Sequence, residues 1–352
     1  MNDEEKLLIS SVKEFCEKNV DSLLLEIERD GISKDLTSKI AQQGFLALRL
    51  PPEKGGVGVS RETYVRILAE FALHSASVAT MVMTVNSVIL PILEKSEKAE
   101  PLIDLIVSGE EIPSIPISSD GVIGVPDYSL KLDGSKISGE VPYLLGFGWD
   151  SILAGLDSDD EELSFIREGV TRTKEYSRVG LRGIHIFEAK VDSAAYELFG
   201  ITKVRNEFSK TFSDIDLEIA AIAIGIAENS IEKAIEYSTV RNTFEHPLKD
   251  YQPIAFPLIK LKSEADVAKW FLYGKDKFTE QEAGSLRLMA EELAKNASRQ
   301  SVQTHGGYGY LEDFGIEKNY RDSMALSIIF GTKIALEGKL SRLVFESESG
   351  FI

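Results

Sequence analysis

A glycine-rich stretch in the last third of the chain has residue types suited to ligand binding. It reads QTHGGYGYLEDFG over residues 303–315, with helical patterns on both sides. Gly306, Gly307 and Gly309 let the main chain approach a ligand closely, because no Cβ stands in the way. Gln303 can donate and accept hydrogen bonds at once. The stretch therefore predicts a binding site, and the alternative is a helix C-cap followed by a turn.

Arg241 is a second residue with binding chemistry. It stands in YSTVRNTF, residues 237–244, at the end of a long apolar helical pattern. Its planar guanidinium can bind a pyrophosphate through two parallel hydrogen bonds. The residue type alone does not distinguish this from an ordinary surface arginine.

Composition limits the other kinds of site. The 352-residue chain has 57 acidic and 39 basic side chains, and its formal charge of −18 disfavours nucleic acid and anionic lipid as partners. Its four histidines lack zinc-ligand spacing, and the single Cys16 excludes an internal disulfide or a cysteine-built metal site, so no metal is expected. No apolar run approaches the roughly 20 residues of a membrane span. The acidic, amphipathic N-terminus argues against a signal peptide, so we expect a cytoplasmic protein.

Hydrophobic periodicity divides the chain into three parts. Residues 1–112 have apolar positions at helical spacing, and Ser60 is a predicted N-cap. Residues 113–205 alternate apolar and polar positions, and LDGSKISG, residues 132–139, is a hairpin signal. Residues 206–352 return to long helical patterns with small residues on the packed face. The predicted fold class is α+β, with an N-terminal helical domain, a middle antiparallel β domain and a C-terminal four-helix bundle.

Several strings, in this order, resemble the acyl-CoA dehydrogenase family along essentially the whole chain. They are GFLALRLPPEKGGVG (44–58), YSTVRNTFEHPLKDYQPIAF (237–256), QTHGGYGYLEDFGIEKNYRDS (303–323) and FGT (330–332). The resemblance implies FAD as cofactor, an acyl-CoA substrate and an electron-transfer flavoprotein as electron acceptor. It also implies a dimer of dimers, because in the family the C-terminal groups reach the FAD of a neighbouring subunit. The residues it carries over to cofactor binding are Arg241, Phe244, Gln252, Gln303, Gly306, Gly307 and Thr332, with Tyr143 as the ring packed on the flavin.

The catalytic position departs from the family. Members of the family remove an α-proton from the substrate while the β-hydride passes to the flavin. Their base is usually the Glu of Glu-Gly-Thr, and this chain has Phe330 at that position. Phe330 keeps the backbone N–H that in the family polarises the thioester oxygen. A minority branch has its base at the start of the first C-terminal helix, where this chain has Ile215. Glu218 lies nearly one turn further on the same face and is our candidate base. The alternative is that Asp214, Asp216 and Glu218 only complement the positive end of the helix dipole.

The binding regions also depart from the family. Its Thr-Glu-Pro-x-x-Gly-Ser-Asp string at the flavin edge is shortened here to PISSDGVIGVPD, residues 116–127. Ser118, Ser119 and Asp120 are candidates to replace some of those contacts. The apolar helix over 79–95 is expected to line part of the acyl pocket, or else to be ordinary core.

Several functions stay open on this evidence. The first is an FAD-dependent acyl-CoA dehydrogenase, or a close relative, with a displaced base. The second is a subunit without its own dehydrogenation chemistry, which pairs with a catalytic homologue and donates Arg241 and Gln303 to the partner's FAD. The third is a flavoprotein of the same fold with another reaction, such as nitroalkane oxidation or hydroxylation with oxygen. The simplest alternative is a protein that binds acyl-CoA without catalysing a reaction.

Overall fold

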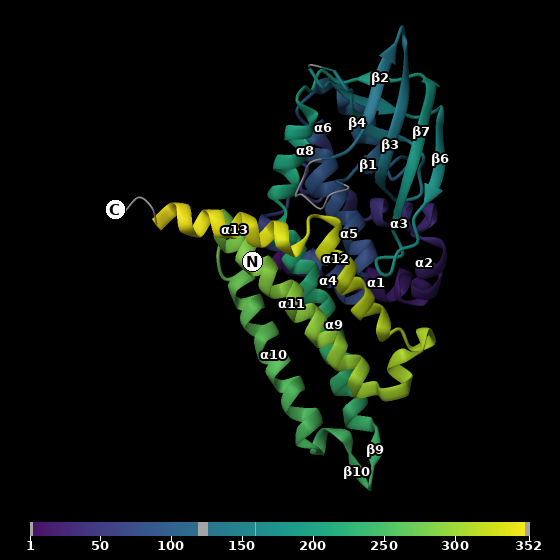
Figure 1. Ribbon diagram of the computed structural model, residues 1–352. Helices are drawn as coiled ribbons and strands as arrows, with labels where there is room; N and C mark the ends of the chain where they lie inside the picture. Colours follow the sequence, from purple (N-terminus) through teal and green to yellow (C-terminus); the bar gives the residue numbers. More distant parts are fainter. Residues whose placement is uncertain (1–2, 119–125, 159, 349–352) are drawn as a thin grey trace.

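The computed structural model describes residues 3–118, 126–158 and 160–348. The strands form the upper end of the molecule, the N-terminal helices lie at mid-height, and the long C-terminal helices extend to the lower end (Figure 1). Along the chain a helical region, an antiparallel sheet region and a second helical region follow one another, which confirms the predicted α+β class.

The N-terminal helices form because serine caps and apolar periodicity coincide. They are α1 (Asp3–Asn19), α2 (Leu24–Asp30), α3 (Lys34–Gln42), α4 (Arg61–His74), α5 (Ala76–Thr84), α6 (Leu90–Leu93) and α7 (Glu100–Val107). Ser60 caps α4, because its Oγ accepts a hydrogen bond from the backbone N–H of Thr63 at 3.2 Å, as predicted. Between α5 and α6 the chain forms a π-helical turn, Val85–Ile89. Such turns are frequent at functional sites, and this one borders the cavity described below.

One expectation about apolar runs is wrong. The segment Ala76–Leu93 has 18 residues with a mean hydropathy of 1.8, so by length and composition it is long and apolar enough to cross a membrane. In the structure 89% of this segment is buried inside the protein. The fold therefore accounts for its apolar character, because α5, the π-helical turn and α6 are the central helices of the core.

The middle of the chain is antiparallel sheet. Its strands are β1 (Ile115–Pro116), β2 (Ser129–Asp133), β3 (Lys136–Gly146), β4 (Ile152–Gly155), β5 (Leu163–Ile166), β6 (Val170–Glu175), β7 (His185–Ala194) and β8 (Glu197–Leu198). Within the described ranges they form a five-stranded sheet, ordered β1-β3-β7-β6 with β2 also on β3, and a three-stranded sheet ordered β4-β5-β8. The predicted hairpin is confirmed, because β2 pairs with β3 up to Asp133 and Lys136, and Gly134 in the turn has φ +62°.

Most of the C-terminal helices form the lower half of the molecule, whereas the first of them lies higher, beside α6 (Figure 1). The C-terminal helices are α8 (Val204–Ser213), α9 (Asp216–Val240), α10 (Gln252–Tyr273), α11 (Glu280–His305), α12 (Glu317–Ile329) and α13 (Lys333–Glu348), with a small hairpin of β9 (Asn242–Thr243) and β10 (His246–Pro247) at the lower tip. Gly225 allows α9 to pack closely on α4, because a Cβ there would lie 2.4 Å from the carbonyl oxygen of Ala69. The domain limits at residues 112 and 205 stay a prediction, and the second falls in the first turn of α8.

Candidate active site

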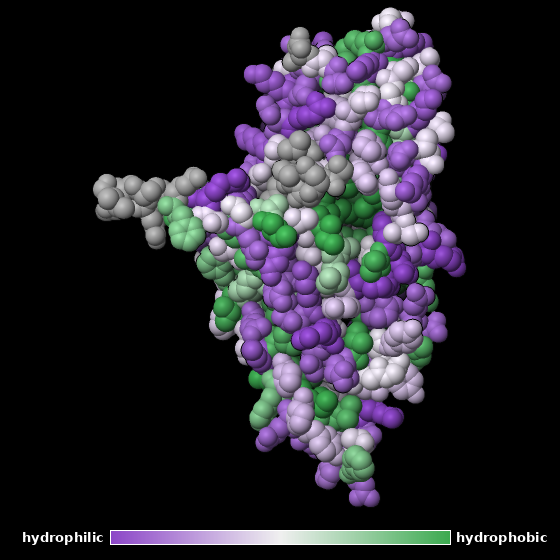
Figure 2. Space-filling model, viewed as in Figure 1, coloured by the Kyte–Doolittle hydropathy of each residue, from purple (hydrophilic) through white to green (hydrophobic). Residues whose placement is uncertain are grey.

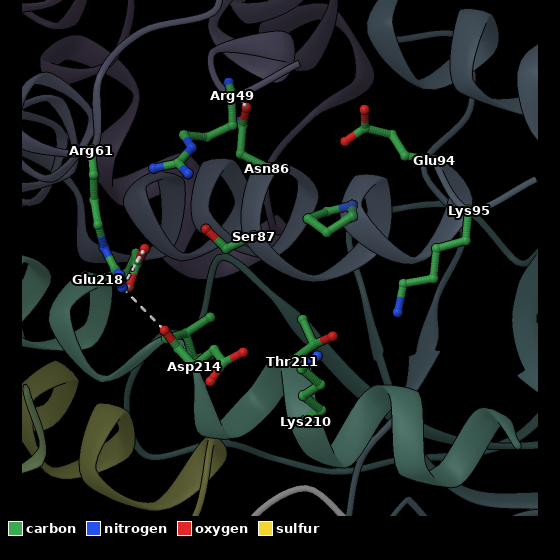
Figure 3. A pocket seen from close by; sticks show the side chains of 12 residues that line it. Arg49, Arg61, Asn86, Ser87, Glu94, Lys95, Lys210, Thr211, Asp214 and Glu218 are labelled. Atoms are coloured by element: carbon green, nitrogen blue, oxygen red, sulfur yellow. Dashed lines mark hydrogen bonds and ion pairs between the residues drawn. The ribbon is translucent and has the colours of Figure 1, made fainter. Parts of the chain in front are cut away.

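A cavity lies at the start of α9, where that helix meets the N-terminal helices and α8 (Figure 3). Its volume is about 370 Å³. The loop before α4, the start of α4, the π-helical turn and the junction between α8 and α9 all supply side chains to it. The lining residues are Arg49, Arg61, Asn86, Ser87, Pro91, Glu94, Lys95, Lys210, Thr211, Asp214, Ile215 and Glu218.

Glu218 is the buried carboxylate of this cavity, with 4% of its surface exposed. The Arg61 guanidinium donates to its Oε2 at 3.2 Å and to its Oε1 at 3.4 Å, and also to the carbonyl oxygen of Asp214 at 3.2 Å. Burial raises the pKa of Glu218, because a carboxylate is poorly solvated there, and the charge of Arg61 opposes the rise only in part. A buried carboxylate with a raised pKa that faces a ligand-sized cavity can act as a general base.

Asp216, two residues earlier, has a different environment. Its Oδ1 accepts from Arg287 at 3.1 Å and its Oδ2 from Lys339 at 3.0 Å. Arg287 is fully buried and also donates to Glu291 at 2.8 Å. Asp216 is therefore held in a buried ion-pair network between α9, α11 and α13. The helix-dipole alternative does not describe either acid fully, since Asp216 and Glu218 each pair with a specific cation.

Phe330 lies in the turn after α12, with only 2% of its surface exposed. Its ring packs near that of Phe212, with centroids 6.0 Å apart. Arg287 donates to the carbonyl oxygens of Phe330 at 3.4 Å and Gly331 at 3.0 Å, and so fixes the turn. The backbone N–H of Phe330 donates to the carbonyl of Ile328. The N–H that was expected to polarise a thioester is thus already engaged within the turn.

Six of the predicted cofactor residues gather at the opposite end of α9. Arg241 is the C-cap that follows α9, Gln252 begins α10 and Gln303 lies in the last turn of α11. The ring of Tyr237 lies on that of His305 with centroids 4.4 Å apart, which brings the ends of α9 and α11 together. The members of this group, which we call the lower-end cluster, are Arg241, Phe244, Gln252, Gln303, Gly306 and Gly307.

The lower-end cluster is open. All six residues are exposed, and Phe244 has 87% of its surface accessible. In the part of the chain that the structure describes, the Arg241 guanidinium has no ion pair. A Cβ at Gly306 or Gly307 would meet no atom within 4 Å. Gly306 is also the C-cap of α11 with φ +58°, so the turn alternative accounts for Gly306 but not for Gly307.

These side chains fit the chemistry of FAD. A cation with a bidentate fork suits the pyrophosphate, amide side chains suit the sugars and adenine, and open glycine backbone allows close approach. The cluster is separated from Glu218 by nearly the length of α9, which has 25 residues and so spans about 37 Å. One chain therefore does not bring its own Arg241 to its own cavity, in keeping with donation to a neighbouring subunit.

The remaining predicted residues lie elsewhere. Tyr143, on β3, is half-buried and stacks on Tyr176 at 5.1 Å with an interplanar angle of 19°. Thr332 immediately precedes α13, and its Oγ1 accepts a hydrogen bond from the backbone N–H of Ala335 at 3.3 Å. Ser118 is half-buried, whereas Ser119 and Asp120 lie outside the described residues.

Sequence reasoning missed several residues of the cavity. Arg49 and Arg61 flank residues 51–58, the Pro/Gly loop whose proline and glycines carry the family resemblance. Asn86 and Ser87 interrupt a long apolar run, which is a readable signal for a polar site. Arg287 gave no signal, because arginine is common on helices and only the fold buries it.

Comparisons with known proteins agree with this architecture. The family models "Acyl-CoA dehydrogenase, N-terminal domain" and "Acyl-CoA dehydrogenase, C-terminal domain" match residues 2–100 and 208–338. The chain is 24% identical to the 3-(aryl)acrylate reductase of Clostridium sporogenes, over 94% of this chain and 95% of that protein. It is 25% identical to the "Caffeyl-CoA reductase-Etf complex subunit CarC" of Acetobacterium woodii, with the same two coverages.

Solved structures of similar proteins have the same fold. The acyl-CoA dehydrogenase of Geobacillus kaustophilus superposes with a TM-score of 0.87 at 22% identity, covering 98% of both chains. The two family models together cover well over half of the sequence, on both sides of the sheet region. The protein therefore belongs to the acyl-CoA dehydrogenase family and is an FAD-dependent oxidoreductase of that fold.

Proposed function

We propose that the protein oxidises an acyl-CoA thioester between its α and β carbons, with Glu218 as the base. The Glu218 carboxylate takes the α-proton, the β C–H bond breaks with its electron pair leaving as hydride, and a double bond forms between the two carbons. Bound FAD supplies the hydride acceptor. The observation that carries the proposal is the buried Glu218 carboxylate beside the cavity at the start of α9.

The environment of Glu218 supports proton abstraction. A thioester α-proton is weakly acidic, so a base in low dielectric is better matched to it than a solvated carboxylate. Arg61 holds the Glu218 carboxylate in place through long hydrogen bonds of 3.2 and 3.4 Å. Because 43% of the Arg61 side chain is exposed, it can move aside toward solvent when substrate enters.

Other residues of the chain take binding roles in this proposal. Tyr143 and Thr332 would contact the flavin held by the same chain. The lower-end cluster would reach the FAD of a neighbouring subunit, which makes the protein a homotetramer, or a hetero-oligomer with a homologue. Exposed apolar residues on α10 support such an assembly. Figure 2 shows apolar patches along the lower half of the molecule, where α10 lies. These residues are Phe256, Ile259, Val267, Trp270 and Phe271.

We also propose an electron acceptor and a metabolic role for the protein. An electron-transfer flavoprotein is the expected electron acceptor, because one relative is a subunit of a complex named for "Etf". We propose a role in fatty acid metabolism, and the cytoplasmic location stays a prediction from the acidic first helix.

A subunit without dehydrogenation chemistry is the second candidate function. Two observations favour it. The Phe330 N–H donates to Ile328, and Tyr143 stacks on Tyr176, so two groups expected at the flavin and thioester already have partners within the chain.

The test is the anaerobic absorption spectrum of the purified protein before and after acyl-CoA addition, for the natural chain and Glu218→Gln. We expect the flavin band of the natural protein to bleach with a matching ester. Glu218→Gln should bind FAD equally well but bleach more slowly by about 10²- to 10⁴-fold, the usual contribution of a general base. Glu94→Gln is the control, since Glu94 lines the cavity but pairs with Lys54 at 3.3 Å.

Three results would contradict one or the other proposal. Bleaching of Glu218→Gln at the natural rate would show that another group is the base. A band that only shifts with every ester would favour the subunit without chemistry. The subunit without chemistry would also be favoured if the purified chain lacked flavin and co-expression with a homologous chain restored flavin binding.

A further inference from the structure

The segment over 79–95 lines the cavity beside Glu218, but largely with polar side chains. Met81 and Met83, which were expected to face an acyl pocket, are fully buried in the core. The lining residues of the segment are Asn86, Ser87, Pro91, Glu94 and Lys95. The last two of these lie at the end of the cavity away from Glu218 (Figure 3). They therefore meet the far end of a ligand that starts at Glu218.

Lys95 reaches across this end of the cavity. Its amino group points toward α8 (Figure 3), where it pairs with the carboxylate of Glu207. The two side chains are 42% and 28% exposed, so the ion pair keeps part of its hydration. Ser96 Oγ donates to the carbonyl oxygen of Phe199 at 2.5 Å, which ties the end of α6 to the segment before α8. The Lys95–Glu207 pair is therefore held between α6 and α8 at the end of the cavity.

A second cavity, of about 620 Å³, begins at the same two residues, because Glu94 and Lys95 line both cavities. Glu94 pairs with Lys54 at 3.3 Å, and Lys54 is a lining residue of the second cavity. The charge of Glu94 is thus engaged on the outer side. Lys95, with Glu207, is left as the charged boundary between the cavity beside Glu218 and the second cavity.

The second cavity is acidic. Its charged lining residues are Glu53, Glu94, Glu97, Glu100 and Asp104 with Lys54 and Lys95. CoA carries phosphates, which a surface with this excess of carboxylates repels. A CoA thioester with its α-carbon at Glu218 therefore directs its acyl group, and not its CoA, toward Lys95.

An aliphatic chain that reaches Lys95 and Glu207 displaces water from both charged groups and offers no hydrogen bond in exchange. Taking a charged group out of water without a new partner costs free energy. A chain that ends before the pair leaves the hydration of the pair intact. The pair thus discriminates between chain lengths by its charge, in addition to any effect of its bulk.

We propose, resting on the function proposed above, that Lys95 and Glu207 determine the upper limit of acyl chain length. Straight acyl chains that end before the ion pair bind, and chains that would cover its charges are rejected. The limit is therefore set by charged side chains at the junction of α6 and α8. It is independent of the chemistry at Glu218, which lies at the other end of the cavity.

The test measures binding of butanoyl-, hexanoyl-, octanoyl- and dodecanoyl-CoA to the FAD-loaded protein by calorimetry. We expect binding to weaken about 10- to 100-fold once the chain reaches the pair, the range for burying a polar group without a partner. Lys95→Met combined with Glu207→Gln removes both charges at nearly unchanged volume and should move the limit to longer chains, as should Lys95→Ala. Lys39→Met combined with Asp35→Asn is the control, since it removes an exposed ion pair on α3 and should leave the limit in place.

Several results would overturn this assignment and leave the proposed function standing. One is binding of all four esters to the natural protein without a limit. Another is a limit that moves in Lys95→Ala but not in the double variant, because bulk and not charge would then set it. Should the double variant fold poorly, Lys95→Gln with Glu207→Gln replaces it, since two amides can still hydrogen-bond to each other.

The proposed function is separated from this assignment by the flavin spectrum. Esters that bind with the expected limit but leave the flavin band unbleached would contradict dehydrogenation and support the role of Lys95 and Glu207. Failure of every ester to bind the natural protein would contradict both.

Discussion

The two ends of α9 both have polar side chains, but these side chains differ in burial and in their partners. At its start, Asp216 and Glu218 are buried and each pairs with cations from other helices, Arg287 and Lys339 for the first and Arg61 for the second. At its other end, Arg241 is exposed and has no ion pair within the described residues. The start of α9 is thus electrostatically complete within one chain. The lower end is arranged to contact a ligand or a second chain.

The hairpin at the lower end has an uncommon backbone conformation. Phe244 and Glu245, between β9 and β10, have φ angles of +48° and +70°. Residues other than glycine in this conformation cost about 1–3 kcal/mol each, and they persist at binding sites more often than elsewhere. The loop between β9 and β10 has two residues, and a two-residue hairpin turn of type I′ takes positive φ at both, so the turn itself accounts for these angles.

The largest effect on stability is expected from Arg287→Met at the start of α9. It removes a fully buried guanidinium and leaves Glu291 without its partner and Asp216 with Lys339 alone. Breaking a buried pair in this way costs about 3–5 kcal/mol of unfolding free energy. Urea denaturation followed by circular dichroism measures the change.

Lys333→Met is the matched control for that change. Lys333 lies half-exposed on α13 and pairs with Glu292 at 3.7 Å on the surface. A surface pair contributes about 0–1 kcal/mol, so this variant should unfold nearly like the natural chain. If both variants lose the same stability, the start of α9 is not the closed network described here.

A smaller effect, of a different kind, is expected from Arg241→Met at the lower end. Since the side chain is exposed and has no ion pair among the described residues, the unfolding free energy of the variant should stay within about 0.5 kcal/mol of that of the natural chain. FAD retention should weaken on the order of 10- to 100-fold, because a charge-assisted bond to the cofactor is lost. Titration of the flavin-depleted protein with FAD measures this, with Lys13→Met on α1 as the charge control. Unchanged FAD affinity would remove Arg241 from the cofactor site.

The sequence was most informative where signals are local. Caps such as Ser60, the hairpin after Asp133 and the long helical patterns each depend on neighbours within a few residues, and the structure confirms them. Glu218 was identified by counting along one helix, and the structure places it on the cavity. Its role as base stays a prediction.

The parts that sequence did not reveal depend on distant contacts. Tyr143 was assigned to the flavin, but the sheet brings Tyr176 against its ring, and strand register is not readable from either segment alone. The burial of Asp216 is explained by Arg287 and Lys339, 71 and 123 residues later in the chain. The π-helical turn at Val85–Ile89 changes which side chains of an apolar helix face the cavity, and 3.6-residue periodicity does not predict it.

The smallest effect expected is a pH dependence confined to the start of α9. Burial raises the pKa of Glu218, so proton abstraction should fail on acidification at a higher pH than the value of about 4.3 usual for glutamate. Because the folded chain binds this proton more tightly than the unfolded chain, Glu218 contributes stability at low pH, and the contribution is lost as pH rises through the raised pKa. Activity and stability should therefore change in opposite directions with pH. Arg61→Met should move the acid limb of the flavin-reduction rate to still higher pH, because the charge of Arg61 opposes the rise. The profile is measured by stopped-flow reduction with a fixed ester. If the acid limb does not move in Arg61→Met, the limb reports a group other than Glu218. Arg241→Met, at the far end of α9, is the control and should leave the limb unchanged.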